Sequence, residues 1–281
     1  MSFGCNAAGV IGCRIIDSPR ERLIAIITNN FVPCNGRFPT LIVIISMFFI
    51  GSDAGHKSIL SAVLLAGVII LGVAITFAVS RLLSATILKG IPSSFTLELP
   101  PYRRPQFGKV ILRSVFDRTL FVLGRAVVAA APAGIIIWIM ANVTVADASL
   151  LSYCSGFLDP FARLCGLDGV ILFAFILGLP ANEIVIPIII MSYMSSGTLV
   201  EFESIYDLKE LLCANGWTWI TAVSVILFSL MHWPCSTTCM TIKKETGSIK
   251  WTAVSVIVPT LIGFIFCFLF ANTARLIISV L

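Results

Sequence analysis

The stretch ILSAVLLAGVIILGVAITFAV, residues 59–79, carries no charged side chain over a length that can cross a membrane. About 20 consecutive apolar residues in an α-helix span the roughly 30 Å of hydrocarbon in a bilayer. Arg81 follows the stretch and Lys89 lies a little farther along the chain. Residues 126–141 and 251–272 form two further apolar runs. The sequence therefore predicts an all-α fold, a polytopic bundle of transmembrane helices.

The composition supports the same class of protein. Hydrophobic residues make up 58% of the 281 positions and charged residues only 12%, whereas a soluble domain carries about 25% charge. The surplus apolar surface must face lipid, so the lipid bilayer is the first expected partner. The net charge of +5 comes from basic residues in short loops beside apolar runs, which is typical of membrane proteins and not of nucleic-acid binding. Nine cysteines without CxxC spacing argue against a disulfide framework or a zinc ribbon.

The charge distribution predicts an orientation. The segment 81–125 is the densest basic region and should lie in the cytoplasm. Its basic residues are Arg81, Lys89, Arg103, Arg104, Lys109, Arg113, Arg118 and Arg125. Within it, residues 107–125 are expected to form an amphipathic helix. A loop around Asp147, Asp159 and Asp168 is expected on the opposite side, and residues 195–216 are expected to form a polar loop.

Several apolar runs are interrupted. A short helix is expected over residues 20–31, because Pro19 suits a first helical position. Two prolines and a glycine in residues 32–39 should end it, and the following run 41–50 is long enough only for a half-helix. A second run, 169–194, is interrupted at 178–183, and a third breaks at 232–235.

These interruptions form an internal repeat. The first half has FGCN at 3–6 and VPCN at 32–35, and the second has LPAN at 179–182 and WPCS at 233–236. Paired interruptions in matching halves are a sequence signature of a transporter site. A broken membrane helix frees backbone carbonyls, which are tolerated only when they are buried in protein or line a wet cavity. We therefore expect a substrate site where the breaks meet.

The candidate site residues follow from that expectation. Cys34 and Cys235 each follow a proline in matching positions, so we expect them to lie close together near the membrane midplane as a metal-handling pair. Glu183 is expected to face a polar cavity, because a charged carboxylate in lipid costs about 2.5 kcal/mol or more. Asn182 precedes it, and Cys239 is a weaker second thiol four residues after Cys235.

Structural explanations for the same residues stay open. Proline and cysteine are common in membrane helices. A lone histidine such as His232 is more often a hydrogen-bonded packing residue than a ligand. Glu183 would be simply hydrated if its break lay near the membrane surface. The other cysteines have no comparable context and are interpreted as structural; they are Cys5, Cys13, Cys154, Cys165, Cys213 and Cys267.

Specific motifs carry a resemblance to a known family. They are GCN at 4–6, PCNGRFP at 33–39, ELPPYR at 98–103, ANE at 181–183 and TIKKETGS at 241–248. Over nearly its whole length the chain resembles the membrane part of the ferrous-iron transport protein B (FeoB) family. In that family the repeated regions are called Gate motifs, they resemble nucleoside-recognition modules, and their cysteines are proposed to handle Fe(II). The resemblance implies Fe(II) as the transported substrate, no permanently bound cofactor, and a multi-pass protein of the bacterial inner (plasma) membrane.

The resemblance also divides the chain. Residues 1–88 would be the C-terminal part of the first Gate region with the following transmembrane helix, and 89–125 a basic cytoplasmic loop with an amphipathic helix. Residues 126–250 would form the second Gate region, and 251–281 a C-terminal transmembrane helix.

The chain departs from the family in one respect. Members have an N-terminal GTPase domain, but this sequence lacks the G-x-x-x-x-G-K-[ST] loop that cradles phosphates. The chain itself is therefore expected not to be an enzyme, and a separate GTPase chain or an N-terminal portion becomes an expected partner. A homo-oligomer stays open. The alternative function is a nucleoside-recognition-type membrane transporter, or an assembly subunit, for a different solute.

Overall fold

The structure is a computed structural model that describes residues 4–49, 57–90, 121–145, 148–194 and 204–280, with the single residues 108 and 112. The described chain is dominated by helices, which confirms the all-α fold class. The α-helices are α1 (Asn6–Gly12), α2 (Pro19–Thr28), α3 (Phe38–Phe49), α4 (Lys57–Ala85), α6 (Phe121–Asn142), α7 (Leu150–Leu164), α8 (Gly169–Leu177), α9 (Val185–Met194), α10 (Ile205–Ala214), α11 (Trp219–Met231), α12 (Ser236–Thr246) and α13 (Ile249–Val280). Short 3-10 helices cover Cys13–Ile15, Asn29–Phe31 and Asn182–Ile184, and β1 (Thr144–Val145) pairs antiparallel with β2 (Ala148–Ser149).

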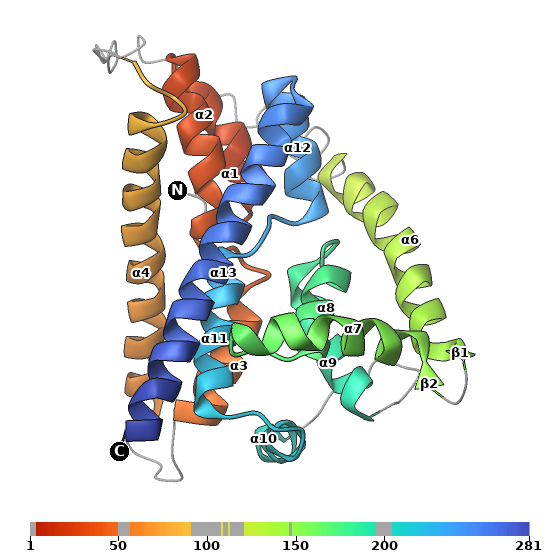
Figure 1. Ribbon diagram of the computed structural model, residues 1–281. Helices are drawn as coiled ribbons and strands as arrows, with labels where there is room; N and C mark the ends of the chain where they lie inside the picture. The colour runs from red at the N-terminus through yellow and green to blue at the C-terminus, as the bar shows by residue number, and fades with distance from the viewer. Residues whose placement is uncertain are drawn as a thin grey trace.

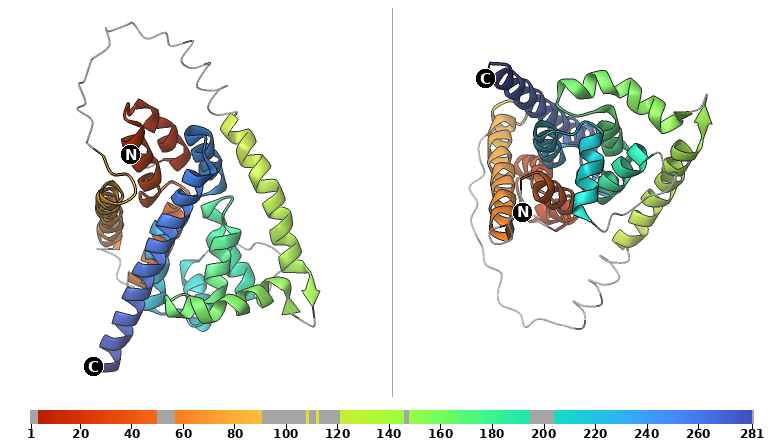
Figure 2. Two further views of the ribbon diagram at one scale, coloured as in Figure 1. Left: turned by 45° about the horizontal axis from the view of Figure 1, so that its top comes forward. Right: turned by 90° about the horizontal axis from the view of Figure 1, so that it is seen from below.

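Long apolar helices show that this is a membrane protein. Among the described residues, Ile59–Ala85, Trp219–Thr246 and Ile249–Ser279 are long and apolar enough to cross a bilayer. The bent pair α7–α8 makes a fourth crossing if it is one span. Many apolar side chains on α4 and α13 are exposed along the outside of the bundle. An apolar surface of this kind requires lipid around it. Figure 2 (right) shows α4 and α6 on opposite flanks of the bundle.

The first broken span consists of α2 and α3. The helix α2 begins as expected: the Ser18 side chain accepts a hydrogen bond from the backbone of Glu21, and Pro19 occupies the first turn. It ends in a 3-10 turn before the break, and α3 then begins at Phe38. The break is shorter than predicted because Pro39 lies in the first turn of α3, where its missing N–H costs no hydrogen bond.

The second broken span consists of α11 and α12. Thr218 caps α11 by accepting a hydrogen bond from the backbone of Thr221. The helix ends at Met231, because His232 has extended backbone and Pro234 cannot continue the helical ladder. The helix α12 begins at Ser236 and ends at Gly247, whose left-handed conformation (φ 62°) suits a glycine C-cap. The predicted break at 232–235 is therefore confirmed.

The two broken spans run in opposite directions, as Figure 1 shows. The span α2–α3 passes from the top of the view to the bottom, whereas α11–α12 passes from the bottom to the top. The long helices α4 and α13 that follow them are also antiparallel. Matching hydrogen bonds mark equivalent positions: the backbone N–H of Asn35 donates to the Gly4 carbonyl (2.7 Å), and that of Ser236 donates to the Leu179 carbonyl (2.8 Å). The broken-helix repeat is thus an inverted-topology repeat.

An arm built from α7, α8 and α9 completes the second half. The axes of α7 and α8 meet at 111°, and the corner is tight: a Cβ added to Gly169 would lie 1.9 Å from the Ser155 carbonyl oxygen. Gly166, beside it, has the left-handed φ of 72° that favours glycine. The helices α8 and α9 pack against each other on one side of the break at 178–182, so this segment turns back rather than crossing (Figure 1).

Two predicted loops are helical. The acidic loop was expected around Asp159 and Asp168, but Asp159 lies inside α7, paired with Arg163 (2.5 Å), and Asp168 caps α8. A carboxylate one turn before an arginine stabilises a helix, which is why these acidic residues do not mark a loop. Residues 205–214 of the predicted polar loop form α10, which is capped by Ser204.

Other predictions fall outside the described residues. These are the loop that contains residues 98–103, residues 107–120 of the predicted amphipathic helix apart from 108 and 112, Asp147, and residues 195–203.

Candidate functional site

The breaks lie near the middle of the bundle because each is flanked by half-length helices. On the side where α2 begins, α2 has 10 residues and α12 has 11, which correspond to about 15 and 16 Å at 1.5 Å per residue. On the other side, α8 has 9 residues and α11 has 13, or about 14 and 20 Å. Since the hydrocarbon core is about 30 Å thick, helices of these lengths on both sides are consistent with the expected position of the breaks near its midplane.

Arg37 joins the two breaks. It is only 1% exposed and is the largest fully buried side chain in the described part of the chain. Its Nη1 donates to the carbonyl oxygens of Asn30 (2.8 Å) and Leu230 (2.9 Å). Its Nη2 donates to those of His232 (3.1 Å) and Trp233 (3.2 Å), and to Asn30 Oδ1 (3.2 Å). One guanidinium therefore binds carbonyls from both repeats.

This arrangement corrects one sequence expectation. The backbone carbonyls near Cys34 and Cys235 were expected to be free to bind a cation. The Arg37 guanidinium, however, already donates hydrogen bonds to the carbonyls of Leu230, His232 and Trp233. Sequence reasoning missed Arg37 although a signal was present. A charged residue inside an interrupted apolar segment is the same signal that selected Glu183.

Asn182 links the re-entrant arm to both broken spans. Its side chain is buried, and its Nδ2 donates to the Cys34 sulfur at 3.8 Å. Its Oδ1 lies 3.3 Å from His232 Nε2. In the first repeat, Asn6 makes the equivalent link, because its Nδ2 donates to Asn30 Oδ1 at 3.4 Å. The repeat therefore positions an asparagine against each broken span.

His232 is a hydrogen-bonded packing residue. It is 1% exposed, and its Nδ1 lies 3.1 Å from the Phe228 carbonyl oxygen and 3.0 Å from that of Ser229. The tautomer decides which contacts are hydrogen bonds: a proton on Nδ1 bonds to these two carbonyls, whereas a proton on Nε2 bonds to Asn182 Oδ1. The ring packs among those of Phe175 and Trp233, with centroids 5.0 and 5.7 Å away. The structural interpretation of this histidine is therefore supported.

The two matched cysteines face the same region. Cys34 lies three residues before Arg37, and Cys235 follows Trp233, whose carbonyl accepts a hydrogen bond from Arg37, by two residues, so both cysteines belong to the breaks that Arg37 joins. Cys34 is buried, whereas Cys235 is partly exposed and its sulfur lies 3.2 Å from the Thr238 hydroxyl. The Cys239 thiol donates to the Pro234 carbonyl at 3.4 Å. Cys239 therefore belongs to the same break, and its proton is already used.

Glu183 reaches across to the first break. A Cβ built on Gly36 would lie 3.2 Å from Glu183 Oε2, so the carboxylate rests against the backbone of the residue before Arg37. The residue itself is exposed on the surface of the described chain. Its carboxylate is thus accessible while lying next to the segment that carries Cys34.

The structure brings all five predicted site residues to the two breaks without closing them around one point. Within the described ranges, no group of three or more His, Cys, Asp or Glu side chains is arranged to hold a metal ion. Each predicted residue instead offers one side chain that could bind a metal ion beside the two breaks. These residues are Cys34, Asn182, Glu183, Cys235 and Cys239.

Comparisons with known proteins agree with this architecture. Residues 123–249 match the Gate family model, described as nucleoside recognition, and residues 65–118 match the model of the ferrous iron transport protein B C terminus. These two matches, with the similar proteins described below, support a FeoB-type C-terminal membrane region. The structure brings the motifs PCNGRFP at 33–39 and ANE at 181–183 together around Arg37 and Asn182.

Similar FeoB proteins come from several bacteria. The Fe(2+) transporter FeoB of Staphylococcus aureus (strain MSSA476) is 28% identical over 99% of this chain and 40% of its own length. That of Campylobacter jejuni is 26% identical over 99% of this chain and 46% of its own. That of Leptospira interrogans (strain Fiocruz L1-130) is 27% identical over 89% of this chain and 38% of its own. The chain thus spans less than half the length of these relatives. No solved structure matches it significantly.

Proposed function

We propose that this chain is a membrane permease module for Fe(II) uptake, the C-terminal part of a FeoB-like, GTP-dependent ferrous iron transporter. It would lie as a multi-pass protein in a bacterial inner membrane. GTP hydrolysis would take place in a separate GTPase chain or in a preceding portion of the protein. The relatives named Fe(2+) transporters match the chain over nearly its full length, which supports iron as the transported ion.

The observation that carries the proposal is the meeting of the two breaks inside the bundle, where Arg37 bonds to both. Fe(II) is borderline in softness, so it accepts thiolate, carboxylate and amide oxygen ligands. Cys34 and Cys235 would handle the ion as a pair, with Glu183 and Asn182 supplying oxygen donors. Cys239 would be a weaker thiol on the same face. These residues come from three segments, with Cys34 on the first break, Asn182 and Glu183 on the re-entrant arm, and Cys235 and Cys239 on the second break, so the ion would pass from donor to donor.

Arg37 gives these donors a useful electrostatic setting. Its buried guanidinium is a fixed positive charge that borders the breaks carrying Cys34 and Cys235. The same charge repels a divalent ion. A transport site must bind strongly enough to admit an ion and weakly enough to release it. The guanidinium therefore favours weak binding and rapid exchange.

The decisive experiment measures Fe(II) uptake by the complete transporter, reconstituted with its GTPase. Cys34→Ser and Cys235→Ser should each reduce uptake, and the double variant should reduce it further, because each thiol is one member of a pair. Cys213→Ser is the matched control, since Cys213 is exposed on α10 away from the breaks. Wild-type uptake by the double variant at equal expression would refute the metal-handling role.

A second candidate function follows from the Gate description, nucleoside recognition. A module of that class would carry a different solute through the same inverted repeat. The cysteines would then be dispensable, while Asn182 and the aromatic rings around His232 would determine the substrate. Inhibition of uptake by nucleosides, with no effect of the two cysteine substitutions, would favour this alternative.

A further inference from the structure

Three hydrogen-bonded side chains join the two ends of the re-entrant arm α8–α9. Asp168 precedes α8, and its Oδ1 caps that helix by accepting from the backbone of Ile171 (2.6 Å). Its Oδ2 accepts a hydrogen bond from the hydroxyl of Tyr193, in the last turn of α9. The Tyr193 hydroxyl in turn accepts from Trp217 Nε1 at 2.9 Å. One hydroxyl group therefore connects the start of α8, the end of α9 and the segment before α11; we call Asp168, Tyr193 and Trp217 the base clasp.

Trp217 connects the base clasp to both repeats. It is 4% exposed and lies between α10 and α11, in the second repeat. Its ring stacks on that of Phe48, near the end of α3 in the first repeat, with centroids 6.0 Å apart and planes at 23°. The base of the arm is therefore joined to the first repeat at a place separate from the two breaks.

The far end of the arm carries two residues of the candidate site. Asn182 and Glu183 lie in the 3-10 turn that leads into α9. The α8 side of the arm is held at the breaks by the Leu179 carbonyl, which accepts from the backbone of Ser236 (2.8 Å). Asn182 makes only longer side-chain contacts there, at 3.3 and 3.8 Å. The position of Asn182 and Glu183 therefore depends on how α9 is held.

Tyr193 is the polar anchor of α9. Most of this helix is buried among apolar side chains, and apolar packing has no directional component. The bonds of Tyr193 are directional, and one of them joins the carboxyl group of Asp168, whose two oxygens both accept hydrogen bonds as an ionised carboxylate does. Hydrogen bonds to a carboxylate are roughly twice as strong as those between neutral groups. Tyr193 can therefore fix where α9 stands along its packing surface.

We propose that Tyr193 is a positioning residue of the candidate site. Through the base clasp it holds α9 so that Asn182 stays against Cys34 and Glu183 stays against Gly36. The part that Asn182 and Glu183 play in handling an ion rests on the proposed function. The effect of the clasp on access to Cys34 rests on the geometry alone.

Tyr193→Phe tests the proposal, because it removes the hydroxyl and keeps the ring. Cys34 is buried and contacts Asn182, so its reaction with a membrane-permeant maleimide reports local opening of the arm. The complete transporter would be labelled in membranes without iron, and mass spectrometry would follow each thiol. We expect Cys34 to react about tenfold faster in Tyr193→Phe, since loss of a hydrogen bond to a carboxylate lowers the free energy of local opening. A Cys34 rate equal to that of the native protein would overturn the proposal.

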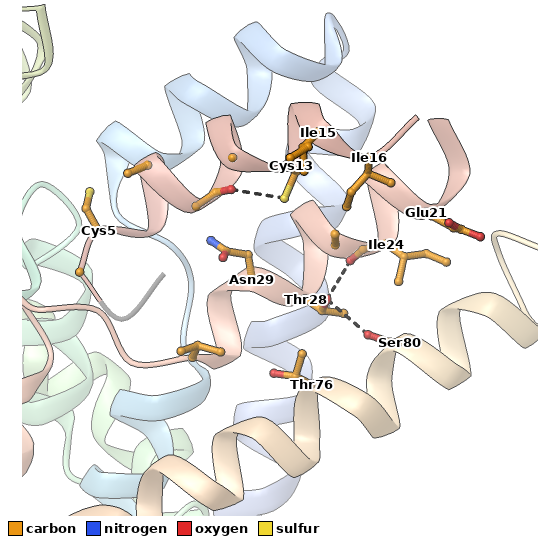
Figure 3. A pocket seen from close by; sticks show the side chains of 16 residues that line it. Cys5, Cys13, Ile15, Ile16, Glu21, Ile24, Thr28, Asn29, Thr76 and Ser80 are labelled. Atoms are coloured by element: carbon orange, nitrogen blue, oxygen red, sulfur yellow. Dashed lines mark hydrogen bonds between the residues drawn. The ribbon is translucent and has the colours of Figure 1, made fainter. Parts of the chain in front are cut away.

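Two other native thiols separate a local effect from general loosening. Cys267 is fully buried, and its thiol donates to the Ser224 carbonyl (3.4 Å), so it should stay unlabelled. Cys13 lines a cavity of about 750 Å³ bordered by α1, α2 and α4, and should react at its native rate (Figure 3). Acceleration of Cys267 as large as that of Cys34 would show general loosening and would also overturn the proposal.

Tyr153→Phe is the matched control. Tyr153 is exposed on α7, and loss of its hydroxyl should change the labelling rate of none of the three thiols.

Trp217→Phe is an independent variant, since it removes the Nε1 donor and keeps an aromatic ring beside Phe48. We expect it to accelerate labelling of Cys34. The acceleration in the double variant with Tyr193→Phe should be smaller than the product of the two single accelerations, because both changes remove the same Trp217–Tyr193 bond. A double variant that reaches the product would contradict the base clasp. Iron uptake is not measured, so failure here would be distinct from failure of the proposed function.

Discussion

Arg37 places a positive charge where the two broken spans cross, and it does so without an acidic partner among its hydrogen bonds. Its partners are carbonyl oxygens that the helix breaks leave without intrahelical donors. Hydrogen bonds to a charged group contribute roughly 1.5–3 kcal/mol each. At the scale of single residues, Arg37 therefore holds the breaks in place, while Cys34 and Cys235 are the thiols proposed to handle the ion.

We expect Arg37→Gln to destabilise the protein. A glutamine cannot reach four carbonyls, and each buried acceptor left unsatisfied costs about 1–3 kcal/mol. The apparent melting temperature in detergent should fall well below that of the native chain. Arg14→Gln is the control, because the Arg14 side chain is exposed and its 2.6 Å pair joins it to Glu245 rather than to the carbonyls of the breaks. A melting temperature for Arg37→Gln equal to that of the control would contradict the statement that Arg37 holds the two breaks in place.

A second prediction at this scale concerns the Glu183 carboxylate. It is exposed yet lies against Gly36, so removal of its charge should alter the ion path and leave the fold intact. Glu183→Gln in the complete transporter should lower Fe(II) uptake at normal expression. Glu210→Gln, on the exposed face of α10, should have no effect. If both variants transport like the native protein, Glu183 is merely a hydrated surface residue.

At the scale of secondary structure, the breaks were predictable because their causes are local. Ser18 with Pro19, and Pro234 after His232, set helix ends by backbone geometry alone. The helix α7 was not predicted, because Asp159 and Pro160 have the composition of a loop. Its helical state depends on packing against α8, a tertiary effect that outweighs local propensity.

The prediction at the scale of secondary structure concerns the corner between α7 and α8. Gly169→Ala should destabilise the protein strongly, since the new Cβ would lie 1.9 Å from the Ser155 carbonyl oxygen and 2.9 Å from the Asp159 nitrogen. Gly156→Ala in the same helix pair should be neutral or stabilising, because nothing lies within 4 Å and alanine favours helix over glycine by about 0.5–1 kcal/mol. Thermal unfolding of the two variants side by side is the measurement, and equal stability would mean that the corner can relax.

At the scale of the whole molecule, the fold gathers basic side chains at one end. The helix α2 begins there, α4 and α12 end there, and α13 begins there (Figure 1). The basic residues at this end are Arg14, Arg20, Arg22, Lys89, Lys243, Lys244 and Lys250. The opposite end, at α7, α10 and the start of α11, carries exposed Tyr153, Tyr206 and Trp219, which is typical of a membrane interface.

This asymmetry predicts the orientation of the protein. The basic end, with the segment 81–125, should lie in the cytoplasm. A cysteine introduced at Arg104 should resist an impermeant thiol reagent added to intact cells and react after the membrane is opened. Native Cys213, at the opposite end, should react in intact cells. Labelling of position 104 from outside would invert the assignment.

The convergence at the site could be predicted only in part. The repeat motifs placed Cys34, Asn182 and Cys235 in matched breaks, and symmetry then favoured their approach. The Arg37 contacts could not be predicted, because its bond to the His232 carbonyl joins positions 195 apart. Such a pairing depends on how two antiparallel spans cross, which no local pattern specifies.

The Arg37 contacts also determine which part of the structure can open. Rocking one repeat against the other would pull the guanidinium away from the Leu230, His232 and Trp233 carbonyls in a dry interior, at a cost of several kcal/mol. The re-entrant arm is held against the broken spans without a charged contact, by the Ser236–Leu179 backbone hydrogen bond (2.8 Å), the packing of Phe175 on Phe228 and the neutral contacts of Asn182. The broken spans would then form a stationary frame, and α8–α9 would swing as the gate. An energy-consuming partner would need to push on that arm alone.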